Sequence, residues 1–182
     1  MVERKRYTVE EFEWLISEGI LEEDERFELI RGEIIEMHIV DHPHASCVSQ
    51  LEFLLHEALG RRAYVWSQNP VRLDDYSRPQ PDVVLLKWRE DCYREQRPTP
   101  DDALLVIEVA SESLSYDLIL KTVLYAEAGI REYWIINIKN HALHIYSEPT
   151  NGMYRTMWTG GLSGVVSLPG DLNAEIDFSE LL

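Results

Sequence analysis

Uninterrupted hydrophobic runs, separated by polar segments with helical spacing, organise the middle of the chain. Val83–Leu86 and Ala103–Ala110 are the two clearest runs. Because neither run alternates with polar residues, both predict strands buried on two faces. A helix is predicted from Ser113 to about Ala128, and the next apolar run is Glu132–Ile138. A helix between two strands is typical of a crossover that joins parallel neighbours.

The amino-terminal part predicts a short helix followed by a hairpin. Thr8–Glu11 has the sequence of a capping box, in which a threonine hydroxyl and a glutamate satisfy the free backbone groups of a helix start. Arg26–Ile30 and Glu33–Met37 are β-prone and flank a turn with glycine, which indicates a hairpin. Glu28 stands between two apolar residues of the first strand, so it is expected to face away from them.

A second helix is predicted to open at His42–His44, where proline occupies the first turn, and to end at Gly60. After it, residues 64–66 and 71–73 predict one bent strand or a pair of strands, and residues 88–102 predict a surface loop. The apolar stripe of this second helix comprises Val48, Leu51, Leu54, Leu55, Ala58 and Leu59.

Near the carboxyl end, His141–Tyr146 is expected to pair with the strand before it through the Lys139–Asn140 turn. From residue 151 onward, short strand-like runs alternate with Gly and Pro, and the pattern gives them no order. The whole chain therefore predicts an α/β protein, with a mixed sheet and flanking helices. No repeat or linker divides the sequence, so residues 1–182 are expected to form a single domain.

The charge balance limits the classes of function. The net charge is −16, from 17 basic and 33 acidic side chains. Such a protein lacks a general electrostatic grip on nucleic acid, so any such role needs a basic patch, a bound cation or a partner. Cys47 and Cys92 stand alone, without zinc or disulfide spacing. The start is charged and no apolar run approaches the ~20 residues of a membrane helix, so a soluble, cytoplasmic protein without a membrane partner is expected.

Asp82 and Glu108 are the residues that suggest chemistry, because each adds a carboxylate to an apolar strand. If they lie about 4 Å apart, they repel by about 4 kcal/mol at an effective dielectric near 20. Either one is protonated or a cation lies between them, and Mg²⁺ with the Val109 carbonyl as a further ligand suits such oxygens. Lys121 would then hold a water or neutralise developing charge. The alternative is that Asp82 caps a strand end and Glu108 pairs with a buried arginine.

These residues carry a resemblance to a known family. The chain resembles the PD-(D/E)xK nuclease superfamily and, more closely, the Uma2 (DUF820) family of restriction-type endonucleases. The resemblance spans about residues 7–146, which would form the core, with residues 151–182 as a strand-rich extension. The segments that match are Phe27–Ile34, Gln80–Val83, Ile107–Ser113, Asp117 with Lys121, and Ala128–Ile135.

The resemblance implies a restriction-endonuclease-like core and Mg²⁺-dependent hydrolysis of phosphodiester bonds, with Mn²⁺ as a substitute. Asp82 and Glu108 would hold the metal, and Glu28 would complete the acidic cluster. The superfamily's usual lysine position is Ala110 here, so Lys121 on the following helix is expected to replace it. Asp117 lies four residues before Lys121 on the same helix face, where it is expected to orient the lysine.

Two accessory residues have competing interpretations. Gln68 matches a glutamine near the site in the family and would bind water or phosphate, or else it is an ordinary polar residue at a strand bend. His44 is expected to be a solvated or capping residue, with an approach to the site as the alternative.

DNA is the expected substrate, and a homodimer is expected because most soluble oligomers are symmetric and cutting a duplex often needs two sites. Two other functions stay open: a nuclease fold that only binds or oligomerises, and a metal-dependent phosphodiesterase that acts on RNA or nucleotides.

Overall fold

The computed structural model describes residues 4–21, 26–37, 41–111 and 113–181. Glu112, which belongs to one of the family-like segments, lies outside these ranges. The helices are α1 Val9–Ser17, α2 His42–Leu59, α3 Leu114–Tyr116 and α4 Thr122–Glu127, with a π-helical turn η2 Asp117–Lys121 and the 3₁₀ turns η1 Pro100–Asp102 and η3 Phe178–Glu180. The strands are β1 Phe27–Ile30, β2 Glu33–Glu36, β3 Ala63–Ser67, β4 Val83–Lys87, β5 Ala103–Ala110, β6 Glu132–Asn137, β7 Ala142–Thr150, β8 Met153–Gly161, β9 Val165–Ser167 and β10 Glu175–Asp177.

A six-stranded mixed sheet forms the centre of the molecule, in the order β3-β4-β5-β6-β7-β8. Strands β5 and β6 are parallel and are joined by the helical run α3-η2-α4, as the sequence predicted for a crossover. The other neighbours are antiparallel, including β6 and β7 around the Lys139–Asn140 turn. The predicted mixed sheet with flanking helices is confirmed.

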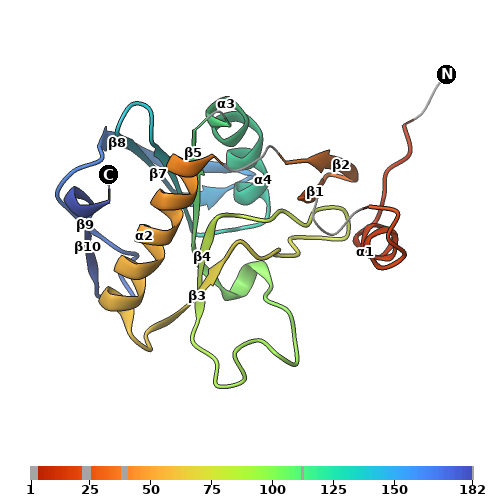
Figure 1. Cartoon of the computed structure of the whole chain (residues 1–182), viewed down its shortest axis with the longest axis horizontal. Helices are drawn as coiled ribbons and strands as arrows, with labels where there is room; N and C mark the ends of the chain where they lie inside the picture. The colour runs from red at the N-terminus through yellow and green to blue at the C-terminus, as the bar shows by residue number, and fades with distance from the viewer. Residues whose placement is uncertain (1–3, 22–25, 38–40, 112, 182) are drawn as a thin grey trace.

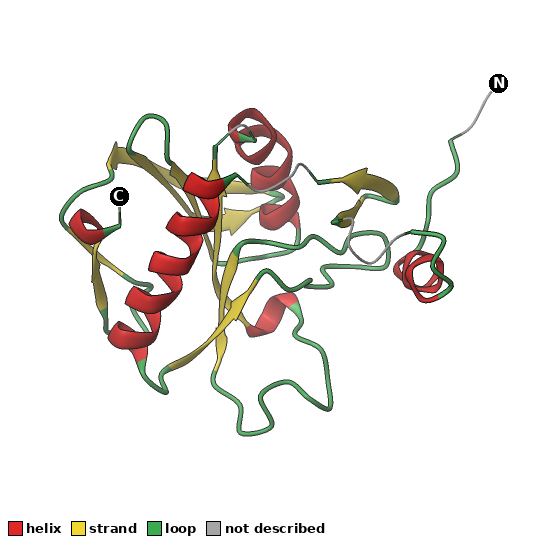
Figure 2. Ribbon diagram, in the orientation of Figure 1, coloured by secondary structure: helices red, strands yellow, loops and turns green. Residues whose placement is uncertain are grey.

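The sheet separates two hydrophobic layers because side chains alternate along each strand. Leu105, Ile107 and Val109 of β5 face α2 and the carboxyl-terminal strands, whereas Val106 and Ala110 face the layer that contains α4. Figure 1 shows α2 across one face with β9 and β10 beside it, and Figure 2 shows the other helical run behind the sheet. Glu108 has the same parity as Val106 and Ala110, so it faces the α4 layer.

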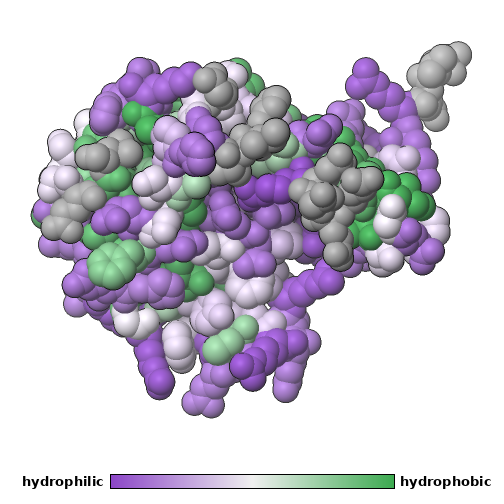
Figure 3. Space-filling view, in the orientation of Figure 1, coloured by the Kyte–Doolittle hydropathy of each residue, from purple (hydrophilic) through white to green (hydrophobic). Residues whose placement is uncertain are grey.

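The first helix and the hairpin form a lobe beside the sheet (Figure 1). The capping box at Thr8 and Glu11 is present, and Leu29 packs against Val9 and Phe12 of α1. The hairpin is linked to the loop before β4 by an antiparallel bridge, in which the backbones of Leu29 and Arg78 exchange two hydrogen bonds. Figure 3 shows strongly hydrophobic residues on this lobe, to which Ile20 contributes an exposed side chain.

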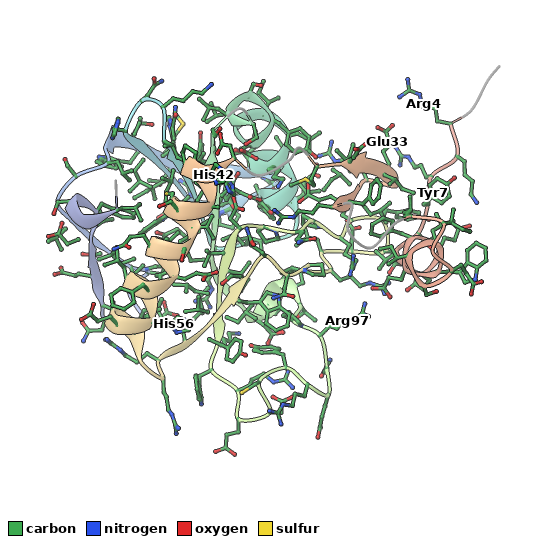
Figure 4. All side chains as sticks on the ribbon, viewed as in Figure 1. Arg4, Tyr7, Glu33, His42, His56 and Arg97 are labelled. Carbon is green, nitrogen blue, oxygen red and sulfur yellow. The ribbon has the colours of Figure 1, made fainter. Side chains whose placement is uncertain are left out.

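Helix α2 crosses the sheet from an Asp41 cap, whose carboxylate accepts the His44 backbone N–H at 2.9 Å. His42 and His56, labelled in Figure 4, lie in its first and last turns. Five of the six predicted stripe residues are fully buried, and Ala58 is partly buried. Gly60, with φ of 55°, ends the helix as predicted.

One local prediction is wrong. Residues 71–73 form no strand; instead, the backbone of Val71 bonds to Pro79 and that of Leu73 to Ser77, within a loop. Its pair of prolines, Pro79 and Pro81, supplies no N–H for a regular ladder. The predicted third helix is present as a helical run from Leu114 to Glu127, with a π-helical turn at its centre. No helix of the described ranges has both the length and the apolar character to cross a membrane.

Candidate active site

The predicted acidic residues meet at one end of β5. Glu28 comes from the hairpin, Asp82 directly precedes β4, and Glu108 lies near the end of β5. Asp117 and Lys121 come from the π-helical turn that follows. All five are buried: Glu28 is 0% exposed, Lys121 1%, Asp117 2%, Glu108 3% and Asp82 7%. Buried charges of this number are found only where they compensate one another or hold a ligand.

Lys121 is the cation at the centre of this cluster. Its Nζ atom lies 2.8 Å from Glu108 Oε1 and 3.1 Å from Glu28 Oε1. Although burial lowers the pKa of the ammonium, the two glutamates and Asp117 outweigh it, and the pKa of Lys121 is raised well above its usual value. The lysine therefore carries its charge while it is enclosed by carboxylates.

Glu28 is held on the side of its strand that the alternation predicted. Phe27 and Leu29 pack with α1, while Glu28 points to the opposite side and accepts the Gln80 backbone N–H at 2.7 Å. Its second oxygen, Oε2, is buried without a hydrogen-bond partner in the described part of the chain.

Asp82 and Glu108 are cross-connected through the ends of β4 and β5. Asp82 Oδ2 accepts the Val109 backbone N–H at 2.8 Å, and Glu108 Oε2 lies 3.4 Å from the Asp82 backbone nitrogen. Burial raises the pKa of Glu108, and the Asp82 charge adds to this, while Lys121 opposes it. The expected alternative, in which Glu108 pairs with an arginine, does not match the structure, because its cationic partner is Lys121.

His44 contacts the site, so the interpretation as a solvated or capping residue is wrong. Its Nε2 atom lies 3.1 Å from Asp82 Oδ2, and its side chain is only 13% exposed. Burial lowers the pKa of His44, but the hydrogen bond to Asp82 and the charge of that carboxylate raise it more. The helix start carries the imidazole to the strand end, since Asp41 caps α2 beside Ser111 at the end of β5.

Asp117 shares the cleft with Lys121, but its own hydrogen bond is to another residue. Its Oδ2 atom accepts the Ser113 hydroxyl at 2.7 Å, whereas the ion pairs of Lys121 are with the two glutamates. Burial raises the pKa of Asp117 and the lysine charge opposes this. Asp117 therefore acts on Lys121 through its charge rather than through the expected direct pair.

Gln68 lies next to the site without lining it. Its backbone N–H donates to the Asp82 carbonyl at 2.9 Å, and its own carbonyl accepts the Gln80 side chain at 2.7 Å. The residue has φ of 49°, a conformation that costs a non-glycine residue energy. Its position supports the loop that delivers Asp82, and a role in binding water or phosphate stays a prediction.

A cleft of about 290 Å³ opens onto the cluster. Its lining residues come from the hairpin segment, the start of α2, the strand ends that carry Asp82 and Glu108, and the α3-η2 run. Tyr116 lines it, and its hydroxyl is buried with no hydrogen-bond partner among the described residues. The lining residues that bear on chemistry are Arg26, His44, Asp82, Glu108, Val109, Ser113, Tyr116, Asp117 and Lys121.

The oxygen donors of this cleft fit a hard divalent cation. Among the residues that the structure describes, no three His, Cys, Asp or Glu side chains are grouped to hold an ion by themselves. Mg²⁺ often takes only one or two carboxylates and completes its shell with water and substrate phosphate. Asp82, Glu108 and Val109 all line the cleft, and the oxygens of the two carboxylates are of the kind that Mg²⁺ and Mn²⁺ prefer.

Tyr125 is a site residue that the sequence reasoning missed. Its hydroxyl donates to Glu108 Oε1 at 2.9 Å from a fully buried ring. A signal was present, since Tyr125 lies four residues after Lys121 and residues at that spacing share a helix face.

Comparisons with known proteins identify a family and a similar fold. The model of the Uma2 family, described as "Putative restriction endonuclease", matches residues 9–178. The fold is similar to the crystal structure of a putative nuclease belonging to DUF820 from Anabaena variabilis ATCC 29413. The TM-score is 0.73 at 17% identity, with 96% of each chain covered. No curated protein matches the chain.

Proposed function

Because the chain belongs to the Uma2 family, we propose that it is a metal-dependent endonuclease that hydrolyses phosphodiester bonds in DNA. The observation that carries the proposal is the contact between the Lys121 ammonium and the carboxylate of Glu108. The superfamily pattern places its lysine at the position of Ala110, which is fully buried here on the same side of β5 as Glu108. Lys121 reaches Glu108 from the helix that covers this side.

The charge balance of the cluster supports a cation as its partner. Four carboxylates, those of Glu28, Asp82, Glu108 and Asp117, surround one ammonium and one imidazole in a buried setting. A divalent ion held by Asp82 and Glu108, with the Val109 carbonyl as a further donor, would compensate this excess. Bound Mg²⁺ would polarise a phosphoryl oxygen and lower the pKa of a coordinated water.

The protein's own residues have separable tasks in this proposal. Glu28 and Glu108 fix the Lys121 ammonium. The ammonium would hold the attacking water and neutralise charge that develops on the phosphate. His44 and the Val109 backbone N–H hold the Asp82 carboxylate by its Oδ2 atom. Arg26 is the basic residue on the hairpin wall of the cleft, where a phosphate would enter.

The test is cleavage of plasmid DNA with and without Mg²⁺ or Mn²⁺, using the parent and the variants Asp82→Asn, Glu108→Gln and Lys121→Ala. His42→Ala is the control, since His42 is exposed on the same helix start as His44. We expect metal-dependent nicking by the parent and the control, and a loss of at least 100-fold in each site variant, as for removal of a transition-state donor. Equal cleavage by parent and site variants would remove the assignment.

Single-stranded DNA, RNA and dinucleotides belong in the same assay, because an acidic cluster does not itself select duplex DNA. The net charge of −16 gives a reason to include them, since a duplex needs basic residues opposite its phosphates. Calorimetry with Mn²⁺ separates the non-enzymatic alternative: a nuclease fold used only for binding or assembly takes up no ion at this cleft.

A further inference from the structure

The two oxygens of Glu108 have different surroundings. Oε1 accepts two hydrogen bonds, from Lys121 Nζ at 2.8 Å and from the Tyr125 hydroxyl at 2.9 Å. Among the described residues, Oε2 has one hydrogen-bond contact, with the Asp82 backbone nitrogen at 3.4 Å, which is too long for a strong hydrogen bond. Oε1 is therefore held by two donors, whereas Oε2 lies on the Asp82 side and has only a weak contact there.

The position of the Tyr125 hydroxyl is fixed by packing. The ring is completely buried on α4, with its centre 4.9 Å from that of the Tyr133 ring. Burial and the charge of Glu108 raise the pKa of Tyr125 well above its usual value, so the phenol keeps its proton and donates. A phenol on a packed ring has little freedom, unlike an ammonium on a four-carbon chain.

Lys121 alone would not set the orientation of Glu108. Its ammonium is shared with Glu28, whose oxygen lies 3.1 Å away, and an ammonium donates in any of three directions. A carboxylate with one such donor is free to rotate about its terminal bond. A second donor on the same oxygen, from a different direction, removes that rotation.

We propose that Tyr125 is a positioning residue that turns Glu108 so that Oε2 faces Asp82 and the cleft, where a divalent cation is taken up. This inference rests on the proposed function, because it assigns a task to Tyr125 within the same site. Tyr125 itself touches neither metal nor substrate; it acts through Glu108, as the outer hydrogen-bond partners of metal ligands do.

The experiment compares Tyr125→Phe with Tyr133→Phe. The control removes the hydroxyl of the neighbouring buried ring of Tyr133. This hydroxyl lies 3.4 Å from the Asp117 carbonyl and makes no hydrogen bond to Glu108. Titration calorimetry with Mn²⁺ should show affinity weakened on the order of 10-fold in Tyr125→Phe and unchanged in Tyr133→Phe. DNA cleavage by Tyr125→Phe should recover at high Mn²⁺, which a general loss of structure would not allow.

A second readout needs no metal. A crystal structure of Tyr125→Phe should show the Glu108 carboxylate turned away from its parent orientation, because one of the two donors to Oε1 is lost. The Tyr133→Phe structure should keep the parent orientation. Equal Mn²⁺ affinity and an unchanged Glu108 orientation in both variants would overturn the proposal.

The two readouts separate this inference from the proposed function. If the parent binds no Mn²⁺, metal-dependent cleavage is rejected, and the comparison of the variant structures alone decides whether Tyr125 orients Glu108. If the parent binds Mn²⁺ and Tyr125→Phe binds it equally well, the function stands and the positioning role is rejected.

Discussion

The Lys121 ammonium lies 2.8 Å from Oε1 of Glu108, with both side chains almost completely enclosed. Removal of one partner of a buried ion pair leaves the other charge uncompensated, at a cost of about 3–5 kcal/mol. Lys121→Met should lower the free energy of unfolding by this amount, measured by urea denaturation at pH 7. The loss should shrink as the pH falls, because burial already raises the pKa of Glu108 and the loss of Lys121 removes the charge that opposes this, so Glu108 takes up a proton more readily.

Lys87→Met is the matched control for this prediction, because Lys87 is an exposed lysine at the end of β4. It should change the unfolding free energy by no more than about 0.5 kcal/mol. Glu28→Gln in the Lys121→Met background should restore part of the lost unfolding free energy, because it removes one of the two carboxylates that Lys121 no longer compensates. A Lys121→Met protein as stable as the Lys87→Met protein would show that the buried pair does not form.

His44→Ala removes the imidazole from the Asp82 carboxylate, to which it is hydrogen-bonded at 3.1 Å. A hydrogen bond to a charged group contributes about 1.5–3 kcal/mol, so the variant should be less stable by about that amount. Asp82 keeps its bond from the Val109 backbone, so Mn²⁺ binding should weaken rather than disappear. His42 lies two residues before His44 and is exposed. The control variant His42→Ala should therefore match the parent in urea denaturation and calorimetry.

The strands and the site carboxylates could be predicted because their signals are local. Continuous hydrophobic runs identified β4 and β5, and alternation placed Glu28 on the side opposite Leu29. Lys121 was found through the family pattern and its place on the helix after β5. These features depend on a few neighbouring residues, which the sequence displays directly.

His44 and Tyr125 were misjudged or missed because their roles depend on tertiary placement. A histidine at a helix start is ordinary in sequence, and only the packing of α2 against β5 brings it to Asp82. The π-helical turn at Asp117–Lys121 has no sequence signature, yet it carries the lysine. The pattern left the strands after residue 150 without an order, although β7 and β8 pair through the two-residue Asn151–Gly152 turn, which is a local hairpin signal. The predicted homodimer stays a prediction.

Glu132→Gln should raise stability at neutral pH. Burial raises the pKa of Glu132, although the Trp134 ring N–H donates to it at 2.7 Å and opposes the shift. A raised pKa means that the folded state binds the proton more tightly than the unfolded state. The contribution of protonated Glu132 to the stability of the fold is therefore complete below the ordinary glutamate pKa of 4.5. This contribution is lost as the pH rises through the pKa of Glu132 in the folded state.

A glutamine still accepts from Trp134 but has no charge to bury, so Glu132→Gln should gain stability over the parent between pH 4 and pH 7. Urea denaturation at several pH values measures this gain. Glu57→Gln, at an exposed position of α2, serves as control and should change the unfolding free energy by no more than about 0.5 kcal/mol. A parent and a Glu132→Gln variant with parallel pH profiles would contradict the shift.

Gly129 ends the crossover helix with φ of +77°, just before the chain enters β6. A Cβ atom built there meets nothing within 4 Å, so Gly129→Ala tests backbone strain without a steric clash. The left-handed conformation costs an L-residue about 1–2 kcal/mol, and the unfolding free energy should fall by that amount. Gly170→Ala also places its Cβ in open space, without a left-handed φ, and should be neutral or stabilising by up to about 1 kcal/mol. Equal stability of the two variants in urea denaturation would mean that the turn after α4 relaxes to accept a side chain. The positions of Lys121 and Tyr125 on the preceding helix would then not depend on that turn.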